Sequence, residues 1–170
     1  TYTLASGTSK EVLVEIVEGD APIISVVPKT IKKNIGDSLA NGEAIFDGVT
    51  VSDTEDDAAN LTINISSDKS TIDTSAKSVQ IVKYNAQDSD GNNAVTKIRE
   101  YIIGYKKDPT LENDLNLIAD DFTLKLSEVS SLTDVIAKSK SYAFAWDALT
   151  GEELTVNTNT TELNAIQTAT

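Results

Sequence analysis

The chain of 170 residues contains no cysteine, histidine or methionine, and only 5% of its residues are aromatic. The absence of cysteine and histidine excludes disulfides, thiol nucleophiles, Ser-His-Asp triads and the ordinary zinc and haem sites. No apolar run approaches the length of about 18 residues that a membrane-spanning helix needs. These absences argue against common catalytic chemistry and against membrane insertion of this segment.

Charge of one sign dominates what is present. Asp and Glu number 27 against 14 Lys and Arg, which gives a net charge of −13. Nucleic acids and anionic membranes are therefore poor partners, whereas cations and basic surfaces fit better, and solubility alone also explains the charge. The 39% hydrophobic content, with few aromatics, is typical of thin β-modules.

Two polar joints that contain proline divide the sequence. They lie at residues 18–22 and 106–109, and each proline stiffens the chain and disfavours helix before it. Residues 21–106, here called module A, contain short apolar runs separated by turn residues, which predicts an all-β sandwich. The expected strands are Ile23–Val27, Ile45–Val51, Leu61–Ile65, Val79–Gln87 and Ala94–Tyr105.

The last two strands of module A form the clearest pair. They flank Asp88–Asn93, in which the dipeptide Asp90-Gly91 is a strong hairpin signal. Period-two alternation places Val82 and Tyr84, with Ala86, on one face of the first strand. This face is expected to point into a core.

Residues 107–170 form the front part of a second unit, here called module B. Strands are expected at Phe122–Leu126, Tyr142–Trp146 and Leu154–Asn157. Leu132–Lys138 predicts a short helix capped by Thr133, with an ion pair between Asp134 and Lys138. The segment has no closing hairpin, so as a sandwich it lacks its last strands.

A hairpin of the missing kind is predicted at the other end of the chain. Residues 1–20 contain the strand Thr1–Leu4, a turn at Ala5–Gly7 and an alternating strand at Glu11–Val17. We therefore interpret them as the closing hairpin of a B-type module that continues from a preceding or neighbouring unit. The predicted fold is all-β, with two immunoglobulin-like β-sandwich modules in tandem and the second split across the termini.

Two stretches of sequence resemble a known family. FDGVTVSDTEDDAANLTINISS followed by SVQIVKYNAQDSDGNNAV resembles the immunoglobulin-like repeats of bacterial surface proteins, and ADDFTLKLSEVSSLTDVIAKSKSYAFAWDALTGEELTVNT is similar to a companion repeat of internalin-like, wall-anchored Gram-positive adhesins. The closing motif of that companion repeat matches Tyr2–Val17. The resemblance implies a stalk, spacer or adhesive rod on the bacterial cell surface, and no catalysis.

Five aspartates form a candidate calcium site. Asp53, Asp56 and Asp57 are expected to face Asp88 and Asp90 across the end of the sandwich. Carboxylates together with Asn and backbone carbonyls are the ligands that Ca²⁺ needs, and many extracellular modules bind it weakly. The spacing around Gly91 excludes an EF-hand. The alternative is two solvated turns whose Asp and Gly residues serve backbone geometry.

Three other sets of residues bear on function. Asp56 and Asp57 would diverge in a strand and have no aromatic platform beside them, so a glycosidase site is disfavoured. Trp146, the only tryptophan, shares a strand face with Phe144, which predicts a core position. A Lys–Asn isopeptide bond, which would lower the mass by the equivalent of one NH₃, remains open because no pair can be selected from the sequence.

These observations predict a non-catalytic extracellular structural or adhesive repeat that forms a stalk or fibre. Its partners are copies of itself or adjacent repeats, joined head to tail by chain continuity or by strand complementation. In an end-to-end rod, residues 1–20 and module B would lie at opposite ends of module A. The alternative is a β-sandwich module that binds a carbohydrate or a host or matrix protein through its loops.

Overall fold

A computed structural model describes residues 2–3, 9–10, 19–56, 65–125 and 130–159. In these ranges the chain is mostly β-strands in sheets with one short helix, which confirms the all-β class. The strands are β1 (Tyr2–Thr3), β2 (Ser9–Lys10), β3 (Ile23–Val26), β4 (Thr30–Lys33), β5 (Val49–Ser52), β6 (Ser66–Ser67), β7 (Ser78–Asn85), β8 (Lys97–Ile103), β9 (Thr110–Glu112), β10 (Leu115–Ala119), β11 (Ala143–Asp147) and β12 (Glu153–Leu154), and the helix is α2 (Leu132–Lys140).

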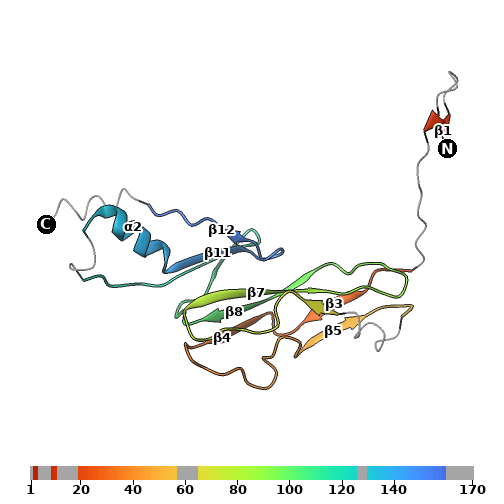
Figure 1. The fold of residues 1–170 in the computed structure, drawn as a ribbon, viewed down its shortest axis with the longest axis horizontal. Coiled ribbons are helices and arrows are strands. Elements are labelled where there is room, and N and C mark those ends of the chain that lie inside the picture. The colour runs from red at the N-terminus through yellow and green to blue at the C-terminus, as the bar shows by residue number, and fades with distance from the viewer. Residues whose placement is uncertain (1, 4–8, 11–18, 57–64, 126–129, 160–170) are drawn as a thin grey trace.

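The strands form four sheets (Figure 1). β1 pairs with β2 in antiparallel register, which confirms the first strand of the predicted hairpin, while its second strand lies outside the described residues. β3 pairs with β5, and a four-stranded sheet has the order β4-β8-β7-β6. The strands of module B form the sheet β12-β11-β10-β9.

The predicted central hairpin is present. β7 and β8 pair from Ser78 opposite Ile103 to Tyr84 opposite Lys97, and a bridge between Gln87 and Asn93 closes the loop. Gly91 has φ +94°, a conformation that glycine adopts without a steric cost. The two longest strands among the described residues are thus joined by the turn that Asp90-Gly91 predicted.

The chain crosses from one sheet to another at Pro28. β3 pairs antiparallel with β5, and after the cis peptide bond between Val27 and Pro28 the chain continues as β4, which pairs parallel with β8. The N–H of Val27 donates to the carbonyl of Gly48, so the crossing point is tied to the loop that precedes β5. This crossing lets one segment of the chain contribute to two sheets.

Two buried clusters lie on opposite faces of the sheet β4-β8-β7-β6. The first is formed by Ile24 and Val26 of β3 with Val82, Tyr84 and other side chains of the central hairpin. The second contains Val79, Ile81 and Ile102 of module A together with Ile118 and Trp146 of module B. Figure 1 shows β11 and β12 on one side of β7, with β3 and β5 on the other.

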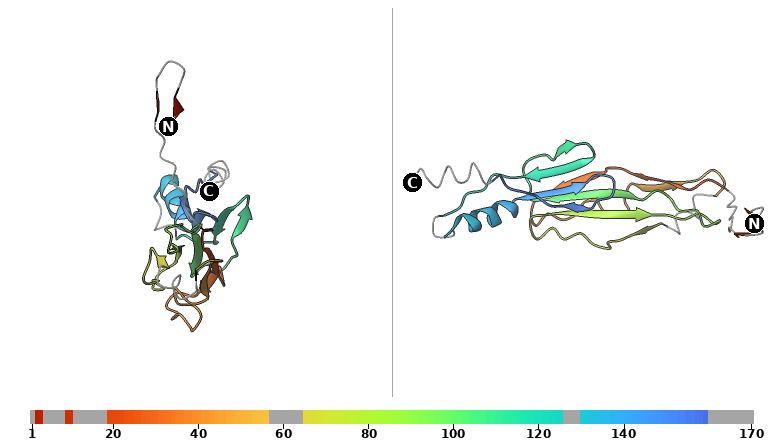
Figure 2. Two further views of the ribbon diagram at one scale, coloured as in Figure 1. Left: turned by 90° about the vertical axis from the view of Figure 1, so that its right-hand side faces the viewer. Right: turned by 90° about the horizontal axis from the view of Figure 1, so that it is seen from above.

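This layering corrects the expected end-to-end arrangement of the modules. Trp146 and Ile118 are fully buried against the outer face of the central hairpin, so modules A and B share a core instead of meeting only at a proline joint. Figure 2 shows the sheet of module B alongside the long strands and α2 beyond the end of that sheet. The module boundaries and the immunoglobulin-like topology remain predictions.

Several predicted elements differ from those observed. Ile45–Gly48 is a turn, so the second expected strand begins only at Val49. Phe122–Lys125 is not a strand, and the module instead begins with β9 and β10, which were not predicted from the sequence. Residues 61–64, most of the third expected strand, lie outside the described residues.

The helix α2 lies where it was predicted but has a different cap. Ser131 is the N-cap and its side chain accepts from the N–H of Asp134, so the prediction of Thr133 as cap was wrong. Both the N–H and the hydroxyl of Ser130 donate to the carboxylate of Asp134. Asp134 therefore lies in the first turn of the helix, where its negative charge interacts favourably with backbone N–H groups that have no partner within the helix.

Candidate functional site

The acidic stretch after β5 folds into a turn held by its own first carboxylate. Asp53 Oδ1 accepts from the N–H of Glu55 at 2.9 Å and from that of Asp56 at 3.2 Å. The N–H of Glu55 does most to lower the pKa of Asp53, burial opposes this, and the N–H of Asp56 adds to the lowering. The turn is therefore built around an ionised Asp53 at neutral pH.

The structure brings this turn to the β7–β8 loop, as predicted. Asp56 accepts from both the N–H and the hydroxyl of Ser89, each at 2.7 Å. Asp88 is only 6% exposed and accepts from the N–H of Asn92 at 2.7 Å and from its side-chain amide at 2.8 Å. Asp56 thus joins the two loops, while Asp88 braces its own.

The joint at residues 19–20 reaches the same end of module A. The N–H of Asp20 donates to Glu55 Oε2 at 3.2 Å. A Cβ on Gly19 would lie 3.3 Å from Glu55 Oε2 and 3.5 Å from Asp90 Oδ2, so the backbone of Gly19 passes close to both carboxylates. Glu55, absent from the predicted ligand set, is therefore the residue that ties the joint to the loops.

The fit of this loop cluster to a cation can be tested on its oxygens. Within the described ranges, no group of three or more Asp or Glu residues is arranged to hold a metal ion, and Asp57 lies outside those ranges. Asp53 Oδ2 is buried without a hydrogen-bond partner, whereas Asp56 and Asp88 use both oxygens within the protein. The observed geometry braces loops, and calcium binding remains a prediction.

A second polar site joins the two modules. Glu100 of β8 is 9% exposed, and its Oε1 accepts from Asn116 Nδ2 and from Trp146 Nε1, each at 2.8 Å. Its Oε2 accepts from the hydroxyl of Thr30 at 2.8 Å. One buried carboxylate therefore links β4 and β8 of module A to β10 and β11 of module B. Trp146 occupies the predicted core position and uses its indole N–H there.

The joint at residues 106–109 is held by Asp120. Its carboxylate pairs with Lys77 at 2.7 Å and accepts from the N–H groups of Lys106 and Lys107. Burial alone would raise the pKa of Asp120, but Lys77 and these N–H groups together lower it. The Lys77 ammonium also lies 4.4 Å from the ring centre of Tyr105, a cation–π contact. The joint is thus anchored on both modules.

A third set of contacts fixes the long loop between β4 and β5. Arg99 is fully buried, and its guanidinium donates to the carbonyls of Val27, Pro28, Ala44, Ile45 and Asp47. The hydroxyl of Tyr101 donates to the carbonyl of Glu43 at 2.9 Å. These side chains hold the loop from inside the core.

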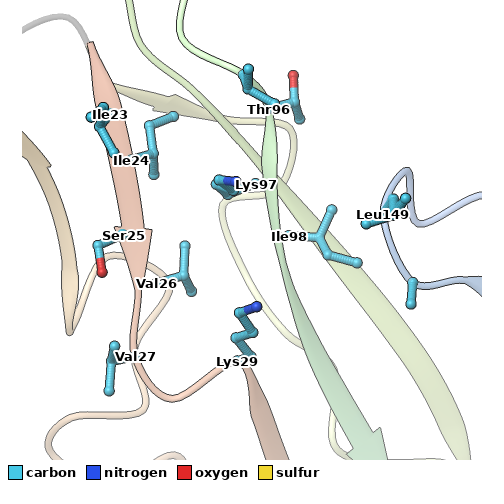
Figure 3. Close-up of a pocket in the computed structure, with 12 residues that line it drawn as sticks. Ile23, Ile24, Ser25, Val26, Val27, Lys29, Thr96, Lys97, Ile98 and Leu149 are labelled. Atoms are coloured by element: carbon cyan, nitrogen blue, oxygen red, sulfur yellow. The ribbon is translucent and has the colours of Figure 1, made fainter. Parts of the chain in front are cut away.

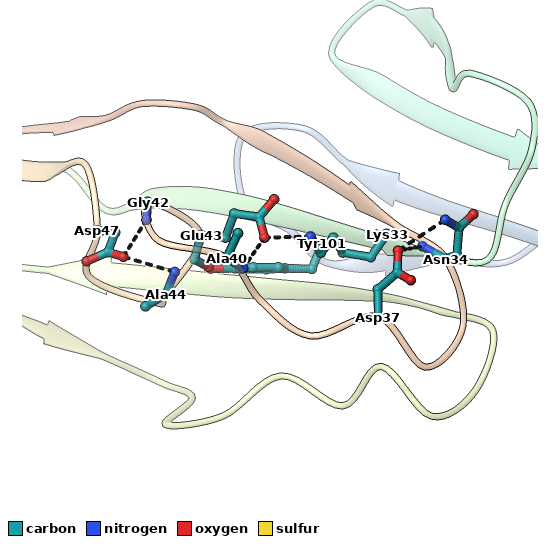
Figure 4. A network of polar contacts seen from close by, with 9 residues as sticks. All are labelled: Lys33, Asn34, Asp37, Ala40, Gly42, Glu43, Ala44, Asp47 and Tyr101. Atoms are coloured by element: carbon teal, nitrogen blue, oxygen red, sulfur yellow. Dashed lines mark hydrogen bonds and ion pairs between the residues drawn. The ribbon is translucent and has the colours of Figure 1, made fainter.

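The outer side of the same loop is held by carboxylates (Figure 4). Glu43 pairs with Lys33 at 2.6 Å, and this contact is the main reason that the pKa of Glu43 is lowered. Asp37 accepts from the N–H of Asn34, and Asp47 accepts from the N–H of Gly42. Residues 34–48 form no strand, so these side-chain contacts hold the loop in its conformation.

Comparison with known proteins gives no assignment. No family model matches the chain, and no curated protein matches it. Among the described residues, no helix is long and apolar enough to cross a membrane.

Proposed function

We propose that this chain is a non-catalytic structural unit of an extracellular stalk or fibre on a bacterial cell surface. The sequence motifs that resemble wall-anchored repeats support this role. The observation that carries it is the shared core, in which Trp146 and Ile118 pack against the outer face of the central hairpin. Such packing makes two modules behave as one stiff body, which is what a spacer needs.

The polar contacts support the same mechanical role. Glu100 binds groups from both modules inside the shared core, and Asp120 holds the joint through Lys77 and two backbone N–H groups. A pull on the chain therefore has to break buried hydrogen bonds and a hydrophobic interface together. Neighbouring units join head to tail, by chain continuity or by strand complementation with residues 1–20 of an adjacent unit.

Single-molecule stretching tests the mechanical part. With the full chain held between handles of known length, we expect residues 19–159 to unfold in one cooperative step of roughly 500 Å at about 3.6 Å per residue. The reason is that the second cluster includes residues from both modules. Separate steps for residues 19–106 and 107–159 would contradict a single load-bearing unit.

Surface labelling tests the location. Antibodies raised against the chain should bind intact cells of the source bacterium, and the signal should disappear after protease treatment of those intact cells. Labelling that requires permeabilisation would overturn the extracellular assignment.

A carbohydrate- or host-protein-binding module remains the alternative function. An aromatic platform for a sugar needs an exposed ring, and Trp146 is fully buried. Phe46, at 47% exposure, lies in the loop before β5 and packs edge-on against Tyr84. Binding of the full chain to a glycan array, abolished by Phe46→Ala, would favour this alternative.

Calcium binding at the loop cluster is a separate proposal. If Asp53 Oδ2 is a ligand, millimolar Ca²⁺ should raise the melting temperature relative to chelator, and Asp53→Asn should remove that increase. Asp73→Asn is a matched control, since Asp73 caps a turn elsewhere through the N–H of Ser75. An unchanged melting temperature of the wild-type chain in Ca²⁺ would contradict the proposal.

A further inference from the structure

An apolar groove of about 620 Å³ runs between β3 and the start of β8 (Figure 3). Its rim carries large apolar side chains that are mostly exposed: Ile23 is 67% exposed, Val95 74% and Leu149 64%. Leu149 comes from the β11–β12 turn of module B, so the groove includes both modules. A cluster of such side chains at one place marks an interaction surface.

Both strands beside this groove have an edge without a strand partner in the part of the chain that the structure describes. β3 pairs with β5 on its other side. β8 pairs with β4 only from Glu100 onward, so Lys97–Arg99 lie beyond that ladder. Edges of this kind accept an added strand through main-chain hydrogen bonds.

We propose that this groove binds the segment Glu11–Val17 of a second copy of the chain, which would pair there as a strand. This inference rests on the proposed function and places strand complementation at an edge of module A, next to the β11–β12 turn of module B, whereas the sequence assigned residues 1–20 to the closing hairpin of a B-type module. The donated strand pairs with the edge of β3 and places Val12, Val14 and Ile16, which alternate in the sequence, into the groove. It thereby links one unit to the next.

Charge supports this occupant. The groove carries Lys29 and Lys97, both exposed, in a chain whose net charge is −13. The donated segment carries Glu11 and Glu15 and is followed by Glu18. An acidic, alternating strand therefore complements an apolar groove that also carries two lysines.

The path of the chain before β3 favours a second copy over the same molecule. Asp20 is bound to Glu55, which follows β5, and β5 lies on the edge of β3 opposite the groove. The backbone of Gly19 lies beside Glu55 and also beside Asp90 of the β7–β8 loop. Residues 19–20 are thus held at the end of module A between these two loops, and a segment folded back onto its own groove would have to reverse direction within residues 19–22.

A peptide binding experiment tests the groove. The probe is a fluorescein-labelled peptide of residues 10–18, and the receptor is the full chain with Val14→Asp, which disables its own donor face. We expect saturable binding by fluorescence polarisation, weakened at least about tenfold by the added pair Val95→Glu and Leu149→Glu. The control Leu111→Glu alters an equally exposed leucine on β9 and should leave the affinity unchanged.

Charge reversal gives a second arm. Lys29→Glu together with Lys97→Glu should weaken peptide binding and remove its salt dependence, whereas Lys69→Glu, outside the groove, should do neither. These variants change exposed or loop side chains, so circular dichroism should confirm that they remain folded. Absence of binding up to about 1 mM peptide, or equal binding by the groove variants, would overturn the proposal.

Introduced cysteine pairs show which chain supplies the segment that fills the groove, because the chain has no cysteine of its own. A chain with Leu13→Cys, mixed with a chain with Ser25→Cys, should form a disulfide-linked dimer of the two under mild oxidation, because Ser25 points away from the groove (Figure 3) and Leu13 alternates with the groove-facing Val12 and Val14. The doubly substituted chain should form linked oligomers. A monomeric internal disulfide would show that the segment occupies its own groove and would overturn the intermolecular link.

Loss of this intermolecular link alone leaves the cooperative stretching step unchanged, so failure of the groove proposal and failure of the proposed structural role are distinguishable.

Discussion

At the scale of single residues, Glu100 is the group on which the contact between modules depends most directly. Its two carboxyl oxygens accept three hydrogen bonds from Thr30, Asn116 and Trp146. A buried acceptor with three donors stabilises the interface only while all three remain paired. This position is therefore sensitive to changes that preserve volume.

Glu100→Gln tests that sensitivity. The substitution converts one acceptor oxygen into an NH₂ donor that faces other donors, and we expect a loss of about 2–4 kcal/mol in the free energy of unfolding. Chemical denaturation monitored by Trp146 fluorescence measures the loss. Glu112→Gln on exposed β9 is the control, and an equal effect from both variants would contradict the argument.

The buried Tyr84 should make the free energy of unfolding depend on pH in the alkaline range. Burial raises its pKa to about 12, and the nearby Arg99 partly opposes this shift. Because the pKa is higher in the folded than in the unfolded state, the stabilisation is complete below about pH 10 and is lost as the pH rises toward about 12. Denaturation curves of wild type and Tyr84→Phe should converge over this interval, and parallel curves would contradict the prediction.

Some residue roles could be predicted from the sequence and others could not. Alternation in β7 and β11 was sufficient to place Val82, Tyr84 and Trp146 in the core. The role of Glu100 was not predicted, since its partners lie 16, 46 and 70 positions away and periodicity contains no information on such contacts. The proximity of Asp56 to the loop of Asp88 was predicted because both residues follow strands that finish at the same end of the predicted sandwich.

At the scale of elements, the loop between β4 and β5 depends on one glycine. Gly48 has φ +66°, and a Cβ there would lie 1.9 Å from the carbonyl oxygen of Val27. That carbonyl belongs to the crossing point between β3 and β4 and also accepts from Arg99. The loop therefore has no room to move away from a side chain at position 48.

Gly48→Ala should lower the free energy of unfolding by more than about 2 kcal/mol, through backbone strain and collision together. Gly42→Ala is the matched control, because Gly42 also has a positive φ but has open space around its Cβ position. Thermal unfolding of the two variants separates strain from collision. Equal destabilisation would show that the collision relaxes.

The same loop explains why element prediction failed there. Ile45 and Phe46 are apolar and β-prone, so they extended the expected strand toward Ile45. The structure uses them in a turn whose carbonyl at Ile45 accepts from the Tyr84 hydroxyl and the Arg99 guanidinium. Tertiary contacts thus override local preference, whereas the hairpin β7–β8 is predictable because its turn and its strands favour the same structure.

At the scale of the whole molecule, the second buried cluster couples the modules. Ile118→Ala should therefore destabilise residues 19–106 as well as module B, by about 2–5 kcal/mol. Hydrogen exchange should show faster exchange in β7 and β8 together with β10 and β11. Leu117→Ala, whose side chain is 44% exposed on the same strand, is the control. Faster exchange confined to module B would show that the modules unfold independently.

The adjacency of Arg99 and Glu100 in β8 has a consequence for how the chain finds its fold. The two side chains point to opposite faces of one strand, the guanidinium toward five carbonyls and the carboxylate toward module B. A slip of β8 by one residue would exchange these faces. It would bury a cation among indole and amide donors and a carboxylate among carbonyl oxygens. A hairpin misaligned by one residue is thus disfavoured on both faces of β8 at once, which favours the observed register before the two modules pack together.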